Sequence, residues 1–421
     1  MNSKIKKLNR IAILSIHTSP LHQPGFGDSG GMNVYITETA KRIAKTGIDV
    51  EIFTRATSTT AQDTMELAPG VLVRHLPAGP FEGLRKEELP AQLCAVTAGL
   101  LRAEASRSEG FYDVIHSHYW LSGQVGWIAK ERWDVPLVHT MHTMALVKNQ
   151  QLAFGDTPEP AVRIIGEQQV VEVADRLVAN TDQEATELVE LYGAEPTKVH
   201  VIHPGVDLDA FVPGDQRLAR ARLGINEDAI VLLFVGRIQP LKGPEVLLQS
   251  AAELLKENPE FRTRLMVAIC GGPSGTGLQQ PKSLQSLTDT LGLRDVVRFI
   301  PPVNRSELVT WFQAATLNVV PSYSESFGLV ALESQACGTP VVASRVGGLV
   351  TTVRDGVSGL LVDGHNPSDW AAAITRIVSD EAFAARLRKG TRTHAELFDW
   401  NSTANELIDI YTLALNNSSY L

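Results

Sequence analysis

The sequence predicts an α/β protein made of two doubly wound domains. Short runs rich in Val, Ile and Leu alternate with longer segments of helical period, which is typical of βαβ units around buried parallel sheets. The chain has 421 residues, enough for two or three domains. A turn-rich segment in mid-chain, HPGVDLDAFVPGD at 203–215, separates two series of such runs. We therefore expect two parallel sheets, one on each side of this segment.

The predicted strands fall in order along the two halves of the chain. In the first half they are 11–16, 50–54, 71–76, 114–118, 137–142, 176–179 and 199–202. In the second half they are 230–235, 264–269, 297–300, 317–320, 340–343 and 359–362. We place one domain at 1–205 and the other at 206–399. A helical segment at about 400–415 follows the last strand, and we expect it to pack back on the first domain.

Composition and charge exclude several classes of protein. Lys and Arg number 38 against 47 Asp and Glu, and the net charge of −9 disfavours a nucleic-acid partner. The three cysteines lie far apart, which excludes a thiolate zinc site and favours a reduced, cytoplasmic location. The apolar run at 11–16 is too short for a signal peptide, and we expect no transmembrane segment.

Polar residues follow the predicted strands of the first domain. His17 follows the first strand, Tyr119 the fourth, and His142 and Thr143 end the fifth. Ligands of open α/β sheets bind at the carboxyl ends of the strands, so these residues predict a shared cleft. Each histidine taken alone also suits a buried strand end. HSH at 116–118 and HTMH at 139–142 lack a carboxylate-bearing motif such as HExxH, which disfavours a catalytic metal.

The second half carries the stronger signals for anion binding. GRIQPLKG places Arg237 and Lys242 in a short loop after a strand, a pair that suits phosphates but also a solvated salt-bridging loop. In SESFGLVALE, Glu325 falls in a loop and Glu333 about one turn into a helix. The backbone N–H groups of 327–330 would point at an anion with the helix dipole behind them. A Gly-rich loop before a helix near Asn33 adds a weaker signal of the same kind.

These residues resemble the retaining glycosyltransferases of family 4, whose GT-B fold sets two Rossmann-like domains across a cleft. The resemblance runs from about residue 10 to residue 415. The chain is similar within that family to the D-inositol 3-phosphate glycosyltransferases of mycothiol biosynthesis. The segments that carry this likeness are HTSPLHQPGFGDSGGMNVY, EGLRKEELP, HSHYWLSGQVGW, HTMHT, GRIQPLKGP, CGGPSG and ESFGLVALE. The resemblance implies transfer of N-acetylglucosamine from UDP-N-acetylglucosamine to an inositol phosphate, with UDP as the second product.

The resemblance implies a donor site mainly on the second domain. Arg237 and Lys242 would clamp the diphosphate, Glu325 would hold hydroxyls of the transferred sugar, and Glu333 would hold the ribose. His142 would lie beside the transferred sugar, and we take it with Arg237, Lys242 and Glu325 as the catalytic set. A family arginine of the uracil-binding loop falls at Val303, which leaves uridine recognition there to backbone groups. The full expected donor set is Gln23, Pro24, Gly31, Arg237, Lys242, Val303, Glu325, Phe327, Gly328, Leu329, Val330 and Glu333.

The resemblance also implies an acceptor site on the first domain. Four residues match a cage for the acceptor phosphate, namely Lys86, Tyr119, Thr143 and Arg163. The expected contacts of the inositol ring are His17, Asp28, Ser29, Gly30, Gly31, Met32 and Asn33. Lys86 lies beside two glutamates at a predicted helix start, so a solvated surface charge would give the same pattern.

We expect that catalysis needs no cofactor. The resemblance implies a structural Mg²⁺ near Ala315 and Thr339, where only main-chain carbonyls or a hydroxyl could bind it. The expected partners are a UDP-sugar donor and a sugar-phosphate acceptor, with a second copy of the chain as a candidate partner. Three alternatives stay open: transfer to fructose 6-phosphate as in sucrose-phosphate synthases, an epimerase acting on the UDP-sugar alone, and a two-lobed sugar-binding protein.

Overall fold

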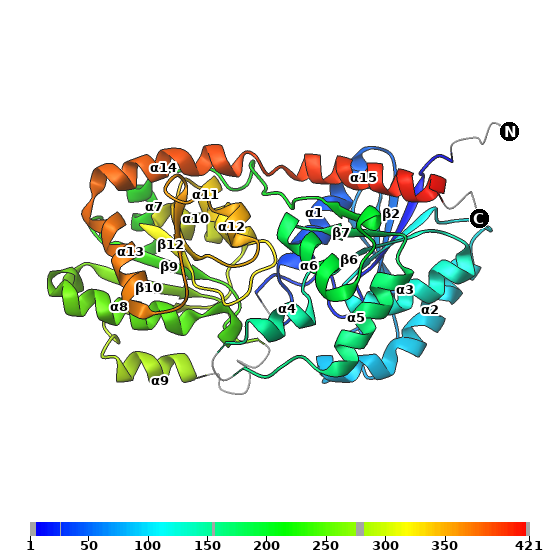
Figure 1. Ribbon diagram of the computed structural model, residues 1–421, viewed down its shortest axis with the longest axis horizontal. Helices are drawn as coiled ribbons and strands as arrows, with labels where there is room; N and C mark the ends of the chain where they lie inside the picture. Colours follow the sequence, from blue (N-terminus) through cyan, green and yellow to red (C-terminus); the bar gives the residue numbers. More distant parts are fainter. Residues whose placement is uncertain (1–5, 26, 154–155, 275–281, 418–421) are drawn as a thin grey trace.

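The molecule consists of two α/β lobes that lie side by side along its long axis (Figure 1). The computed structural model describes residues 6–25, 27–153, 156–274 and 282–417. Phe26 and Gly275, which belong to two of the segments quoted above, lie outside the described residues. Each lobe contains a parallel sheet with helices on its faces, which confirms the predicted fold class.

Among the described residues the first lobe has an eight-stranded sheet in the order β3-β4-β2-β1-β5-β6-β7-β8. All its pairs are parallel except β3 with β4. The strands are β1 Arg10–Leu14, β2 Asp49–Arg55, β3 Thr64–Ala68, β4 Val71–Leu76, β5 Val114–His118, β6 Leu137–Thr140, β7 Arg176–Ala179 and β8 Val199–Val201. The helices are α1 Gly31–Lys45, α2 Leu93–Ala105, α3 Trp120–Trp133, α4 Ala145–Gln150, α5 Ala161–Val173 and α6 Asp182–Tyr192, with 3₁₀ turns at Lys86–Gln92 and Pro196–Lys198.

The second lobe has a six-stranded sheet of described residues, in the order β11-β10-β9-β12-β13-β14, and its pairs are parallel. The strands are β9 Ile230–Val235, β10 Leu265–Cys270, β11 Val297–Ile300, β12 Leu317–Val320, β13 Val341–Ser344 and β14 Gly359–Val362. The helices are α7 Gln216–Leu223, α8 Pro244–Glu257, α9 Ser283–Thr290, α10 Arg305–Ala314, α11 Leu329–Ala336, α12 Leu349–Thr352, α13 Pro367–Ser379 and α14 Glu381–Ala395, with 3₁₀ turns at Pro240–Lys242 and Pro259–Thr263.

The first sheet differs from the predicted strands by more than one residue in three places. The sequence analysis missed β3, because TMELA is a largely exposed antiparallel edge strand without an apolar run. The strand expected at 11–16 already ends at Leu14. The strand expected at 137–142 ends at Thr140, because the chain turns there and His142 takes a positive φ of 60°. Both early ends occur where the chain enters a loop at the carboxyl edge of the sheet.

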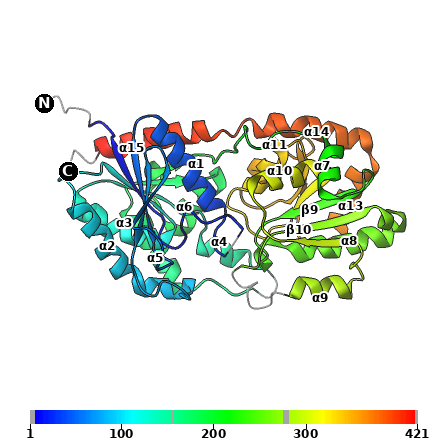
Figure 2. The same ribbon diagram turned by 180° about the vertical axis from the view of Figure 1, so that it is seen from behind.

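The last helix crosses from the second lobe to the first. α15 (Trp400–Asn417) follows α14 and lies over α1, as Figures 1 and 2 show from opposite sides. Trp400 and Tyr411 are buried in the same apolar cluster as Ile11 and Val138 of the first sheet. A Cβ added at Gly205 would lie 2.2 Å from the Trp400 nitrogen, so the segment around Gly205 and the start of α15 are in backbone contact at this glycine. The two lobes are therefore joined by two adjacent segments of chain.

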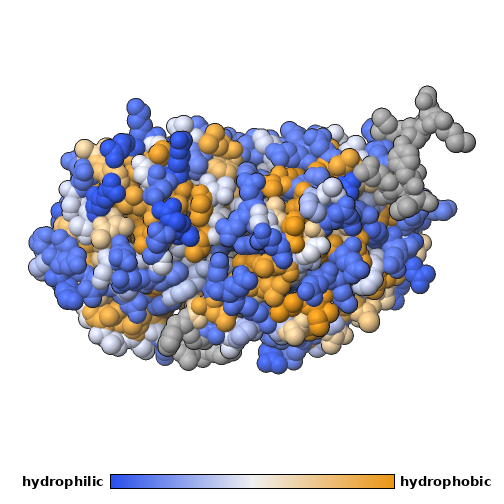
Figure 3. Space-filling model, in the orientation of Figure 1, coloured by the Kyte–Doolittle hydropathy of each residue, from blue (hydrophilic) through white to orange (hydrophobic). Residues whose placement is uncertain are grey.

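The surface of the molecule is mixed in character. Figure 3 shows hydrophilic side chains over both lobes, with hydrophobic patches between them. The exposed large apolar residues include Val162 and Ile165 of α5. Isolated residues of this kind are normal on protein surfaces. In the described part of the chain, no helix is both long and apolar enough to span a bilayer.

Candidate active site

A cavity of about 420 Å³ lies between the two lobes and is lined by residues of both. This volume is within the range of ordinary small-molecule sites. The expected site residues that line it are His17, Gln23, Pro24, Asp28, Gly30, Gly31, Met32, Lys86, Tyr119, His142, Thr143, Arg237, Lys242, Val303, Glu325, Phe327, Gly328, Leu329, Val330 and Glu333. The carboxyl ends of both sheets thus supply one shared cavity, as the rule for open α/β sheets predicts.

Four residues far apart in sequence converge on the first-lobe wall. The Lys86 ammonium lies 4.8 Å from the ring centre of Tyr119, and the Arg163 guanidinium lies 5.0 Å from it. Arg163 also donates to the carbonyl of Thr143 at 3.0 Å and to its hydroxyl at 2.9 Å. Tyr119 has a φ of 71°, a strained value for a residue with a side chain. Two cations thus lie against the Tyr119 ring, and one of them also binds the Thr143 hydroxyl.

Arg163 does not itself line the cavity, because it is buried behind that wall. Its side chain is only 2% exposed, and its Nε donates to Glu167 at 2.7 Å. Glu167 also accepts the backbone N–H of Ala145 at 2.9 Å and the hydroxyl of Tyr192 at 2.5 Å. A buried carboxylate with three donors holds the guanidinium in place.

The His17 ring packs against the same tyrosine at an interplanar angle of 43°. Its ring centre lies 4.3 Å from that of Tyr119. Burial, followed by the charges of Lys86, His142 and Arg163, holds the pKa of His17 well below its usual value. Its Nδ1 is buried without a hydrogen-bond partner among the described residues. A neutral imidazole with a free nitrogen suits contact with a hydroxyl group of a ligand.

Two residues of the expected inositol set shape the loop and do not line the cavity. The Asn33 amide donates to the Ser19 carbonyl at 2.6 Å, and its oxygen accepts the backbone N–H of Gly30 at 3.2 Å. The Ser29 hydroxyl donates to the His22 carbonyl at 3.2 Å. These bonds hold the Gly-rich loop at the start of α1, so both side chains position the loop from outside the cavity wall.

The Gly-rich loop reaches the second lobe. Asp28 forms an ion pair with Arg237 at 3.7 Å. A Cβ at Gly31 would lie 3.4 Å from the Leu329 side chain at the start of α11. Gln23 donates to the main-chain oxygen of Val303 at 3.0 Å, so one backbone acceptor of the expected uracil loop is already engaged.

The second-lobe wall combines cations with a helix N-terminus. Lys242 donates to Glu325 at 2.6 Å, and the Ser322 hydroxyl lies 3.4 Å from the same oxygen. α11 begins at Leu329, after Gly328 with a φ of 100°, so its first N–H groups face the cavity. Burial raises the pKa of Glu333 to about 8, and the charge of Arg305 opposes this shift. This wall therefore offers positive charge that could bind an anion. It also offers the carboxyl group of Glu333, which lies one helical turn further along α11.

A pair of glycines, which the sequence analysis missed, supports the same loop. A Cβ at Gly347 would lie 2.1 Å from the Glu325 carbonyl oxygen, and one at Gly348 would lie 2.2 Å from the Phe327 Cα. Gly348 N–H donates to that Glu325 oxygen at 2.9 Å. The signal in the sequence is the GG dipeptide in the loop after β13, because glycines without a Cβ allow another backbone to approach so closely.

His142 is held from two sides. Its Nε2 lies 2.8 Å from Nδ1 of His118, and its carbonyl accepts the Ser326 hydroxyl of the opposite lobe. Burial lowers the pKa of His142 to about 3, so the ring is neutral. Further from the cavity, His116 pairs with the Tyr411 hydroxyl of α15 at 2.6 Å. The hydrogen bonds thus hold His118 to His142 and His116 to Tyr411, and no group of three metal-binding side chains occurs among the described residues.

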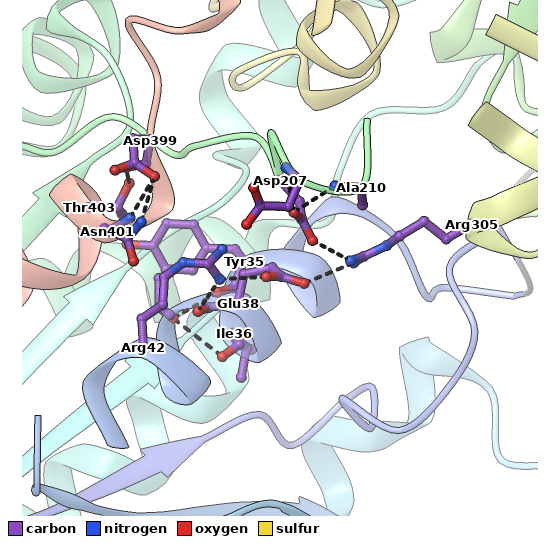
Figure 4. A network of polar contacts seen from close by, with 12 residues as sticks. Tyr35, Ile36, Glu38, Arg42, Asp207, Ala210, Arg305, Asp399, Asn401 and Thr403 are labelled. Carbon is purple, nitrogen blue, oxygen red and sulfur yellow. Dashed lines mark hydrogen bonds and ion pairs between the residues drawn. The ribbon is translucent and has the colours of Figure 1, made fainter. Parts of the chain in front are cut away.

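A charged contact joins the lobes beside the cavity. Arg305 of α10 lies 2.8 Å from Glu38 of α1 and 2.8 Å from Asp207 of the connecting segment. Figure 4 shows its guanidinium between the two carboxylates, with Arg42 on the far side of Glu38. Sequence reasoning missed this contact too, because its partners lie 267 positions apart.

Ala315 and Thr339 do not fit a divalent cation. The Ala315 carbonyl accepts the Gln216 amide at 2.7 Å, and the Thr339 hydroxyl donates to the Phe312 carbonyl at 2.6 Å. The Arg220 guanidinium donates to the carbonyl just before Ala315 at 3.0 Å. The Thr339 carbonyl accepts the Ser334 hydroxyl at 3.1 Å, so both main-chain oxygens already have a protein donor, and a cationic side chain lies beside Ala315. We assign no step of the reaction to a metal.

Comparisons with known proteins identify both lobes. Residues 30–205 match a model described as "Glycosyl transferase 4-like domain", and residues 215–394 match "Glycosyl transferases group 1". The chain is 60% identical over 408 residues to "D-inositol 3-phosphate glycosyltransferase 2" of Catenulispora acidiphila, covering 97% of this chain and 96% of the relative. It is also 60% identical over 415 residues to the D-inositol 3-phosphate glycosyltransferase of Thermobispora bispora, covering 99% and 97%.

Solved structures agree with this assignment. Sucrose-phosphate synthase of Thermosynechococcus elongatus superimposes with a TM-score of 0.87 at 31% identity, covering 96% of this chain and 98% of that one. HepE of Anabaena, solved with UDP and glucose, has a TM-score of 0.76 at 21% identity, covering 95% and 98%. The second likeness shows the fold alone. Together the neighbours confirm the predicted GT-B architecture.

Proposed function

Because the chain belongs to the family of D-inositol 3-phosphate glycosyltransferases, we propose that it transfers N-acetylglucosamine from UDP-N-acetylglucosamine to 1D-myo-inositol 3-phosphate. UDP is the second product, and the anomeric configuration is retained. The family assigns the acceptor, and the choice of donor sugar follows the sequence resemblance. The reaction needs a nucleotide diphosphate and an acceptor phosphate to be held in one cavity.

One observation carries this proposal: the cavity has a cationic site on each lobe. Arg237 and Lys242 line it from the second lobe, and Lys86 lines it from the first with Arg163 behind. An enzyme that joins a sugar diphosphate to a phosphorylated acceptor binds two anions. An epimerase acting on the UDP-sugar alone, or a protein that only binds sugar, has no use for the second cationic site.

The second-lobe groups support a front-face transfer with retention. In this mechanism the departing β-phosphate takes the proton of the acceptor hydroxyl on the same face of the sugar. Arg237, Lys242 and the N-terminus of α11 stabilise the charge that develops on that phosphate. The His142 carbonyl and Ser326 bring the two lobes into contact beside the reacting groups. Contact between the lobes excludes water, which would otherwise hydrolyse the donor.

The test is UDP release from a panel of UDP-sugars, each measured with inositol 3-phosphate, with free inositol and without acceptor. We expect efficient release only with UDP-N-acetylglucosamine and inositol 3-phosphate together. An α-linked product in the NMR spectrum of the isolated glycoside would establish retention. Release that does not depend on a phosphorylated acceptor would contradict the proposal.

A second candidate acceptor is fructose 6-phosphate. The likeness to a solved sucrose-phosphate synthase, at 31% identity over nearly the whole chain, favours it. The same cationic site on the first lobe would bind its phosphate. Including fructose 6-phosphate in the panel distinguishes the two acceptors, since only one of them should reach saturation in the micromolar to millimolar range of ordinary substrates.

A further inference from the structure

Lys148 is a third cation on the acceptor side of the cavity. It lies on α4, five residues after Thr143, and its side chain is 23% exposed. It lines the same cavity as Lys86, and its ammonium contacts the carboxylate of Glu159. Burial, then the charges of Arg163 and Lys86, lowers the pKa of Lys148 to about 7. The surroundings of Lys148 are thus rich in positive charge, and a further anion there would be stabilised.

Arg163 contacts protein acceptors through all three of its guanidinium nitrogens. Its Nε donates to Glu167, its Nη2 donates to Thr143, and its Nη1 forms an ion pair with Glu159 at 2.8 Å. These contacts use four of the five N–H groups of the guanidinium and leave one hydrogen on Nη1. A phosphate that binds Arg163 through two N–H groups therefore has to replace one of these partners.

Glu159 is the partner that can leave. The Glu167 side chain is 0% exposed and also accepts other protein donors. Separating Glu167 from Arg163 would therefore leave a buried carboxylate without its cation. The Glu159 side chain is 19% exposed and links Lys148 to Arg163. Its backbone is fixed by a bond from its N–H to the Asn149 side chain at 2.7 Å. Rotation of the side chain alone would release both cations without moving the main chain.

The charges then favour a phosphate. Glu167 stays with Arg163, and displacement of Glu159 frees the ammonium of Lys148, which lines the same cavity as the ammonium of Lys86. A phosphate monoester carries about −1.5 to −2 at neutral pH. We propose that Lys148 is a further binding residue for the acceptor phosphate, and that Glu159 occupies the phosphate's place between Lys148 and Arg163 until the acceptor binds. This inference rests on the proposed function.

Two variants test the inference with opposite expected results. Lys148→Met removes the ammonium and should raise KM for inositol 3-phosphate roughly tenfold or more, the usual effect of losing a charged hydrogen bond, with a smaller change in kcat. Glu159→Gln removes the competing charge and should lower that KM. If the Glu159 carboxylate only held Arg163 in position, Glu159→Gln would instead raise KM for inositol 3-phosphate. A raised KM for Glu159→Gln, or an unchanged KM for Lys148→Met, overturns the inference.

Controls separate this inference from the proposed function. Lys148→Arg keeps a cation and should restore a near-normal KM, which shows that charge and not packing is lost. Lys256→Met removes an exposed lysine paired with Glu253 and should leave KM unchanged. A wild type that uses inositol as well as its phosphate would defeat the proposed function. If the wild-type enzyme prefers fructose 6-phosphate, only the proposed identity of the acceptor is wrong. KM for fructose 6-phosphate then tests the role of Lys148 in the same way.

Discussion

The guanidinium of Arg305 in the second lobe lies 2.8 Å from the carboxylate of Glu38 in the first. Glu38 is nearly buried and also binds Arg42, whereas the Arg305 side chain is 45% exposed. Because Glu38 keeps a second cation, the loss of Arg305 strands no buried charge. We therefore expect the Arg305–Glu38 ion pair to add little to the stability of either lobe. Its main effect should be to hold the two lobes together.

The first prediction concerns this contact. Arg305→Gln should lower the free energy of unfolding by only about 1 kcal/mol, since the pair is partly exposed. It should lower kcat/KM more clearly, because the lobes close less often on the two substrates. Steady-state kinetics beside a thermal melt measure both. Arg262→Gln is a matched control: that arginine is equally exposed, but its partner Asp295 lies in its own lobe. An equal loss of activity in the control would count against a role in closure.

The second prediction concerns the donor phosphates. Arg237→Ala or Lys242→Ala should reduce turnover strongly at saturating donor, because each removes charge stabilisation worth roughly 3 to 4 kcal/mol from the departing phosphate. The melting temperature should change far less. Arg294→Ala, which removes an exposed guanidinium of the same lobe, serves as the control. Near-normal rates in both site variants would refute the assignment.

The third prediction follows from Glu333, whose pKa burial raises to about 8. Ribose hydroxyls donate to a carboxylate, so UDP binding should lower this pKa and release a proton near pH 7. UDP affinity should then rise between about pH 6 and pH 8. The free energy of unfolding of the ligand-free protein should change in the opposite direction. Because the pKa of Glu333 is raised in the folded state, this stability falls as the pH rises toward 8.

Calorimetry in buffers of different ionisation enthalpy measures the released proton. Glu333→Gln should abolish the release and flatten the dependence of UDP affinity on pH. The matched control is Glu245→Gln: burial also raises the pKa of Glu245, to about 7, but this residue is outside the cavity lining. Proton release that survives in Glu333→Gln would show that another group titrates.

The strands and the anion-binding residues could be predicted because local sequence encodes them. A short run of apolar residues such as IVLLFV at β9 is typical of a strand that is buried on both faces of a parallel sheet. The loop that carries Arg237 and Lys242 could be predicted because the whole signal, GRIQPLKG, lies in eight adjacent residues. The contacts of Arg305 with Glu38 and of Lys86 with Tyr119 could not be predicted in this way, because they depend on how separate elements pack. The edge strand β3 was missed for a related reason, since its stability comes from pairing with β4 and not from its own apolar pattern.

The fourth prediction is that chelation leaves catalysis largely intact. Two cations and a helix N-terminus already face the expected diphosphate, and the main-chain oxygens of Ala315 and Thr339 already accept protein donors. Activity after dialysis against EDTA should stay close to that of the untreated enzyme. A complete loss that Mg²⁺ reverses would contradict this and would require another ligand set.

The fifth prediction concerns the acceptor phosphate and needs a careful choice of variant. Arg163→Ala alone would leave Glu167 as an unpaired buried charge, which typically costs about 3 to 5 kcal/mol and confuses binding with misfolding. The double variant Arg163→Met with Glu167→Gln removes both charges of the pair together. It should keep most of the stability, because replacing a buried pair is often close to neutral.

This double variant should lose roughly tenfold or more in kcat/KM for inositol 3-phosphate, since a charged hydrogen bond contributes about 1.5 to 3 kcal/mol. Binding energy from the phosphate, remote from the reacting hydroxyl, orients the acceptor, so free inositol should be a poor substrate of the wild type. The preference for the phosphorylated acceptor should therefore shrink in the double variant. UDP affinity should stay unchanged, because the diphosphate is assigned to Arg237 and Lys242 on the opposite wall. Loss of UDP binding, or an undiminished preference for the phosphate, would show that Arg163 does not serve the acceptor.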